Sequence, residues 1–222
     1  HSFPTRRSSD LNRTNEISHI FLNSIKRKNL RATNQGASGR CWMFAALNTF
    51  RHLLINTLDL EQFEFSEVYL FFWDKLERSN SYIKWFIDHP EEKPGDRAHE
   101  YMLTDYMTDG GWWNTFANLV NKYGLVPASA MKETFQSEDS EAMNKIIKER
   151  LDWSVNYISL NRNKIDLEEF RKNVVGKIYD ILVKFLGEPP KTFSWYYDRH
   201  HEDQDSGIIA KLTPKKFLNM VV

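Results

Sequence analysis

Apolar residues recur along most of this chain at the three- and four-residue spacing of helices that bury one side. A helix over residues 40–55 would carry apolar side chains on nearly every face, which is typical of a central, buried helix. Ser38 and Gly39 stand where its N-cap would lie, and Ser66 is the candidate N-cap of the next helix. The pattern predicts helices over residues 12–30, 40–55, 65–89, 97–107, 112–124, 138–152 and 166–186.

The pattern changes near the carboxyl end. Phe193, Trp195 and Tyr197 alternate along residues 192–198, which indicates a strand, and residues 207–212 predict a second one. Thr213 and Pro214 then predict the start of a helix, because proline is well suited to the first helical position. The sequence therefore predicts an α+β protein that is mostly helical and forms strands only late in the chain.

Composition narrows the class of protein. The 222 residues include 30 Lys and Arg and 30 Asp and Glu, so the net charge is zero and gives no bulk attraction to nucleic acid or to an anionic membrane. No apolar run approaches the ~20 residues of a membrane-spanning helix. A single cysteine excludes an internal disulfide framework and a Cys-rich metal site, and no metal or cofactor is predicted.

That single cysteine, Cys41, lies in the predicted first turn of the 40–55 helix, directly behind a Gly-Ala-Ser-Gly-Arg run. A helix N-terminus favours negative charge and therefore the thiolate, and the glycines let backbone approach a substrate closely. Gln35 offers a neutral N–H donor of the kind that stabilises the oxyanion of acyl transfer. A lone cysteine on an apolar helix is more often a small buried hydrophobe, but the combination with Gln35 and Trp42 favours a nucleophile.

The stretch QGASGRCWMFAAL resembles the active-site segment of papain-like cysteine peptidases, with Ser38 where secreted relatives have a disulfide cysteine. The segments FEFSEVYLFFWDKLER, DGGWWNTFANLVNKYGLVP, GEPPKTFSWYYD and LTPKKF are similar to stretches of the cytosolic bleomycin hydrolase and bacterial aminopeptidase C branch. The resemblance implies a papain-like cysteine peptidase fold, with Cys41 as the catalytic nucleophile and Gln35 as the oxyanion donor.

The same resemblance implies a substrate-binding role for the turn formed by Asp109, Gly110 and Gly111. In this fold a glycine pair lines the substrate cleft, and the backbone of Gly111 would pair with the bound peptide. The alternative is an ordinary tight turn without contact to substrate. Trp42 is expected to pack in the core between domains.

A general base is harder to find. His52 follows Cys41 by eleven residues on the same predicted helix, which places it about 16 Å away and out of reach for proton transfer. His200 and His201 lie in the hydrophilic, acidic loop DRHHEDQDSG, a poor platform for a positioned base. The resemblance implies that the catalytic His and Asn lie beyond Val222, after helical insertions.

The domain organisation follows from the resemblance. Residues 1–11 read as an artefact or tag, residues 12–125 as the helical left-hand domain with the nucleophile, and residues 126–222 as a helical insertion and the start of the β domain. The chain would be an N-terminal fragment, inactive alone, of a cytoplasmic cysteine aminopeptidase that cleaves peptides through an acyl-enzyme. The resemblance also implies a homo-hexamer at full length.

The rival hypothesis is a non-catalytic binding protein on a papain-like scaffold, for example one associated with nucleic acid. The neutral net charge and the absence of a basic stripe in the sequence disfavour this alternative.

Overall fold

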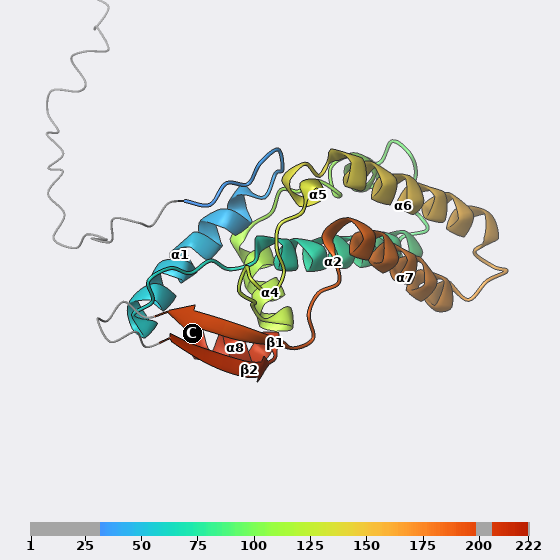
Figure 1. Ribbon diagram of the computed structural model, residues 1–222. Helices are drawn as coiled ribbons and strands as arrows, with labels where there is room; N and C mark the ends of the chain where they lie inside the picture. Colours follow the sequence, from blue (N-terminus) through green and yellow to red (C-terminus); the bar gives the residue numbers. More distant parts are fainter. Residues whose placement is uncertain (1–31, 199–205, 222) are drawn as a thin grey trace, which may run out of the picture. The chain divides into compact units, whose positions relative to one another are not determined.

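The computed structural model describes residues 32–198 and 206–221 (Figure 1). The helix predicted over 12–30, the tag predicted over 1–11, and both His200 and His201 lie outside the described residues. In chain order the elements are α1 (Cys41–Leu58), α2 (Glu67–Asp88), α3 (Arg97–Thr104), α4 (Trp113–Tyr123), α5 (Phe135–Glu138), α6 (Glu141–Asn161), α7 (Leu167–Leu186), β1 (Phe193–Asp198), β2 (Ser206–Leu212) and α8 (Pro214–Val221).

Every helix and strand predicted within the described residues is present, so the prediction of a mostly helical α+β protein is confirmed. Ser66 is the N-cap of α2, as predicted, and its hydroxyl accepts a hydrogen bond from the backbone N–H of Tyr69. The N-cap predicted for α1, at Ser38 and Gly39, was wrong, because the N-cap is Arg40. The hydroxyl of Ser38 is instead used within the preceding loop.

Helix α2 lies at the centre of the helical part and packs against α1, α4, α6 and α7. Its buried residues include Phe71, Phe72 and Ile83, each with no exposed surface. Helix α7 meets it with a stripe of apolar residues at four-residue spacing, which places them on one face of the helix. These residues are Val174, Ile178, Leu182 and Leu186.

Strands β1 and β2 form an antiparallel hairpin, with Trp195 opposite Ile209 and a bulge between Phe193 and Trp195. Trp195 is buried on the side of the hairpin that faces α8, where its ring meets Phe217 edge-on at 5.2 Å between centroids. Phe63 and Phe65, from the segment before α2, complete this aromatic cluster. The hairpin and α8 are thus held to the helical part by aromatic packing.

Helix α4 ends at Gly124, as predicted, with φ +81°. A side chain at this position would be strained, and a Cβ would lie 2.4 Å from the backbone of Pro214 at the start of α8. Gly124 is therefore required twice, for the end of α4 and for the close approach of α8.

Candidate active site

Cys41 is the first residue of α1, and its side chain is exposed to solvent. A residue at this position has no intrahelical acceptor for its backbone N–H, so that group remains available to a ligand. The first turn contains no acidic residue, and the aligned peptide dipoles of α1 favour negative charge there. Within the described part of the chain, no side chain forms a hydrogen bond or ion pair with the thiol. The position suits an accessible nucleophile rather than a buried hydrophobe.

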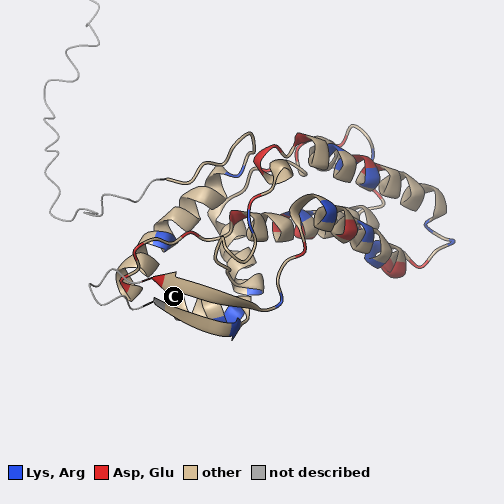
Figure 2. Ribbon diagram, in the orientation of Figure 1, with Lys and Arg blue, Asp and Glu red and all other residues tan. Residues whose placement is uncertain are grey.

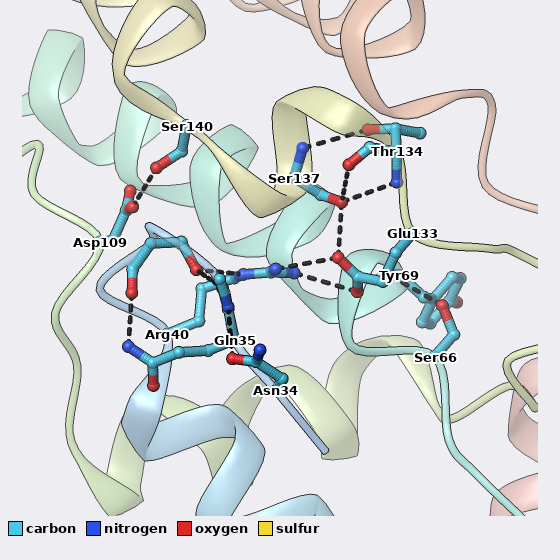
Figure 3. Close-up of polar contacts among 12 residues, drawn as sticks. Asn34, Gln35, Arg40, Ser66, Tyr69, Asp109, Glu133, Thr134, Ser137 and Ser140 are labelled. Atoms are coloured by element: carbon cyan, nitrogen blue, oxygen red, sulfur yellow. Dashed lines mark hydrogen bonds and ion pairs between the residues drawn. The ribbon is translucent and has the colours of Figure 1, made fainter.

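The loop before Cys41, residues 35–40, is the nucleophile loop, and its conformation is set by hydrogen bonds of its own (Figure 3). The side-chain amide of Gln35 donates to the carbonyl of Ser38 at 2.5 Å, and the Ser38 hydroxyl donates back to the carbonyl of Gln35 at 2.7 Å. One N–H of the Gln35 amide is therefore engaged within the loop, and the amide carries a second N–H donor. Ser38 thus holds this loop by hydrogen bonds.

Gly36 adapts the nucleophile loop to its surroundings. Its φ is +63°, and a Cβ there would lie 2.6 Å from the carbonyl oxygen of Glu138. The next residue, Ala37, donates its backbone N–H to the same carbonyl at 2.7 Å. The glycine in the motif is thus needed for a backbone tie to a segment about a hundred residues later in the chain.

Arg40 fixes the other end of the nucleophile loop, a role that sequence reasoning missed. Its guanidinium has no exposed surface and forms a bidentate pair with Glu133, with N–O distances of 3.1 and 2.9 Å (Figure 3). The third nitrogen, Nε, donates to the Ser38 hydroxyl at 2.8 Å, and the group lies over the rings of Phe44 and Phe71. The only signal in the sequence was an arginine directly before Cys41.

Asp109, Gly110 and Gly111 form the glycine turn. The Asp109 carboxylate is buried and contacts Lys75 Nζ at 2.6 Å, with further hydrogen bonds from Ser140 Oγ at 2.5 Å and Asn144 Nδ2 at 2.8 Å. Burial alone would raise the pKa of Asp109, but the Lys75 charge and these hydrogen bonds outweigh it and lower the pKa to about 2. The carboxylate of Asp109 is thus engaged by other side chains of this chain.

The glycine turn packs on Trp42, the residue after Cys41. The Trp42 indole donates from Nε1 to the carbonyl of Asp109 at 2.8 Å. A Cβ on Gly111 would lie only 2.5 Å from the Trp42 ring, so the ring occupies the space of a side chain. Gly110 is exposed. The surface that the turn offers to a peptide is therefore the backbone of Gly110 and Gly111.

The three histidines within the described residues contact groups other than Cys41. His52 contacts the side chain of Asn56 on the same helix, at 3.0 Å from Nε2. His89 Nδ1 lies 2.9 Å from the carbonyl of Trp85 at the end of α2, and His99 packs edge-on against Phe86. Among the described residues, no group of three His, Cys, Asp or Glu side chains is placed to hold a metal ion.

The charged residues of the described segments do not gather by sign. Lys and Arg are interspersed with Asp and Glu along α6 and α7 (Figure 2). None of the described helices combines the length and the apolar character needed to span a membrane.

Comparison with known proteins gives a consistent result. The model of the Peptidase C1-like family matches residues 5–222. Aminopeptidase C of Listeria monocytogenes is 40% identical over 195 residues, which cover 86% of this chain and 43% of that enzyme. Bleomycin hydrolase of Homo sapiens is 33% identical over 205 residues, which cover 90% of this chain and 45% of that enzyme.

A solved structure agrees with the fold. The crystal structure of PepW from Lactobacillus rhamnosis HN001 superposes with a TM-score of 0.81 at 34% identity, over 86% of this chain and 43% of that one. The predicted papain-like fold is confirmed by this match. The chain spans less than half the length of these three relatives.

Proposed function

Because this chain belongs to the Peptidase C1-like family, in the aminopeptidase C and bleomycin hydrolase branch, we propose that it carries the nucleophile of a cysteine aminopeptidase. The observation that supports this most directly is the exposed thiol of Cys41 at the first position of α1. It follows a loop in which Gln35 is fixed by hydrogen bonds.

In the proposed reaction the Cys41 thiolate attacks the carbonyl carbon of the substrate's first peptide bond. The carbonyl oxygen becomes an oxyanion, which accepts hydrogen bonds from the second N–H of Gln35 and from the backbone N–H of Cys41. The C–N bond then breaks, the amine leaves with a proton from a general acid, and a thioester remains. Water attacks the thioester and gives its proton to the same group acting as base, the C–S bond breaks, and the acid product leaves with the Cys41 thiolate restored.

We propose that this acid and base is a histidine, oriented by an asparagine, in a part of the enzyme beyond Val222. Two facts support the proposal: the relatives are about twice as long, and no described histidine contacts Cys41. The chain alone should therefore not hydrolyse aminoacyl-coumarin substrates. Turnover by the chain that is lost on His200→Ala or His201→Ala would show that the base lies in that loop instead.

The glycine turn completes the proposed site. The backbone of Gly111, next to the exposed Gly110, would pair with the extended peptide, as an additional strand does along a sheet edge. For the full-length enzyme we also propose a homo-hexamer, on the basis of the family resemblance alone, and sedimentation velocity tests it.

Turnover by the full-length enzyme tests the proposed function. Cys41→Ser should abolish hydrolysis of aminoacyl-coumarin substrates. Gln35→Ala should lower kcat by about 10²–10³ with a small change in KM, because the oxyanion exists only in the transition state. Thr49→Ala, on an exposed position of α1, is the matched control. Wild-type rates in the Cys41→Ser variant would rule the proposal out.

A further inference from the structure

The nucleophile loop and the glycine turn are joined through one side chain. Asp109 Oδ2 accepts a hydrogen bond from the backbone N–H of Gly39 at 3.2 Å. The two segments are in direct contact at this point, since a Cβ on Gly39 would lie 2.9 Å from the Cβ of Asp109. The Trp42 indole bonds to the carbonyl of the same residue. Asp109 therefore links residues on both sides of Cys41 to the turn that would hold the peptide.

The charge of Asp109 is matched by Lys75 of α2. Lys75 has no exposed surface, and Asp109 is 8% exposed, so the pair is screened little by water. The same ammonium also reaches the carbonyl of Thr108 at 3.2 Å. One turn further along α2, Arg78 donates to the carbonyls of Tyr106 and Gly110, at 3.2 and 2.5 Å. The glycine turn is thus anchored on the rigid central helix.

We propose that Asp109, with its charge balanced by Lys75, is a positioning residue that sets the spacing between the nucleophile loop and the glycine turn. It acts on the reaction through Cys41 and the backbone of Gly111, without touching the peptide. The catalytic consequence of this inference rests on the proposed function, whereas the hydrogen bond between Asp109 and Gly39 does not. The substrate-binding role expected from the sequence for the turn of Asp109, Gly110 and Gly111 stays a prediction, and within that turn we propose that the Asp109 side chain holds the backbone in place.

Two double variants separate the effect of the hydrogen bond between Asp109 and Gly39 from the effect of the buried ion pair with Lys75. Both carry Lys75→Met, which removes the ammonium, and they differ only at residue 109. Asp109→Asn keeps an oxygen acceptor for the Gly39 N–H, whereas Asp109→Leu has a similar shape and no acceptor. Trp42→Phe removes the indole tie alone and gives the same test without a change at the ion pair. Asn144→Ala removes a donor to Asp109 that belongs to neither segment, and is the matched control.

The first readout is amide hydrogen exchange of the folded chain, followed by NMR at Gly39, whose N–H donates to Asp109. We expect exchange at Gly39 to be about tenfold faster in the Leu double variant than in the Asn double variant. Trp42→Phe should also accelerate it, and Asn144→Ala should not. Equal rates in the two double variants, or in Trp42→Phe and the parent chain, would overturn the proposal.

The second readout is the rate of Cys41 alkylation by a peptidyl epoxide, divided by the rate with iodoacetamide. The ratio should fall by about tenfold in the Leu double variant, because misplacing the turn affects only the reagent that must bind along it. An unchanged ratio with faster exchange would mean that the tie is merely structural, and would overturn the proposal. A parent chain without preference for the peptidyl reagent would contradict the proposed function, while the exchange result would still decide the tie.

Discussion

Glu67 is a carboxylate buried at the first position of α2, only 6% exposed. Burial raises its pKa to about 7, and the nearby charges of Glu133 and Glu64 act in the same direction, while hydrogen bonds from its own backbone N–H and from Thr33 oppose the shift. Because the folded state holds this proton more tightly than the unfolded state does, the stability that it contributes is fully present below pH ~4.5 and is lost as pH rises through ~7.

We expect the free energy of unfolding to decrease by about 3 kcal/mol between pH 5 and pH 8 on account of Glu67, since each pKa unit corresponds to about 1.4 kcal/mol. Urea unfolding at the two pH values measures this. Glu67→Gln should remove most of the dependence, whereas Glu61→Gln, at an exposed position, should preserve it. Asp109, whose pKa is about 2, does not interfere, because its contribution is lost only below pH ~4. Parallel pH profiles for the two variants would contradict the assignment.

The Arg40–Glu133 pair is a second prediction at the residue scale. Arg40→Met leaves the Glu133 carboxylate, 27% exposed, without its cationic partner and removes one of the hydrogen bonds of the Ser38 hydroxyl. Breaking a buried pair by removing one member is costly, so we expect a loss of about 3 kcal/mol in the free energy of unfolding. Lys84→Met breaks an exposed pair with Asp88 and should cost less than about 0.5 kcal/mol. Similar losses in both variants would show that burial does not strengthen the Arg40 pair.

At the scale of the elements, the start of α2 gives a direct test of capping. The Ser66 hydroxyl accepts from Tyr69 N at 3.2 Å and donates to the Met131 carbonyl at 2.6 Å, so it also joins α2 to a distant loop. Ser66→Ala should lower the free energy of unfolding by about 1–2 kcal/mol. Ser81→Ala, exposed on the same helix, should change it by less than about 0.5 kcal/mol, and thermal melts monitored by circular dichroism compare the two.

The elements that sequence reasoning predicted are those whose signal is local. The Ser66 cap, the end of α4 at Gly124 and the alternation in β1 each depend on a few neighbouring residues. Helix α5 was missed because its four residues, FQSE, have no apolar period and are held by a capping box between Thr134 and Ser137. The N-cap of α1 was misplaced because tertiary ties, such as that of Ala37 to Glu138, decide where the loop ends.

In the candidate site, too, the sequence indicated the residues with a local signal and missed those whose partners are distant in the chain. Cys41 and Gln35 stood out because a helix N-terminus, glycines and a neutral donor occur within one short window of the sequence. Arg40, Lys75 and Asn144 could not be found in this manner. Their partners, Glu133 and Asp109, lie between about 34 and 93 residues away in the chain, and a charged residue inside a helix pattern normally indicates a solvated face.

At the scale of the whole molecule, the domain boundary at residue 125 stays a prediction. Several contacts join the segments on its two sides. Phe72 of α2 meets Tyr179 of α7 at 5.2 Å between ring centroids, Arg40 pairs with Glu133, and Asp109 bonds to Ser140. The segment after residue 125 thus covers part of α2 and completes two buried polar clusters.

A chain ending at residue 125 should therefore bind the dye anilinonaphthalene sulfonate and should lack the cooperative thermal transition of the intact chain, because it leaves apolar surface and buried charges uncovered. Circular dichroism melts and dye fluorescence compare the two chains. A cooperative transition at an unchanged temperature in the short chain would show that residues up to 125 form an independent domain.

The proposed nucleophile is the claim on which the functional account depends, and the single cysteine makes it measurable without ambiguity. The rate of Cys41 alkylation by iodoacetamide at pH 7 is compared between the folded chain and the same chain unfolded in urea, with glutathione correcting for the solvent. We predict several-fold faster alkylation of the folded chain, because Cys41 is exposed at the first position of α1, where the aligned peptide dipoles favour negative charge. Equal or slower alkylation of the folded chain would contradict the claim.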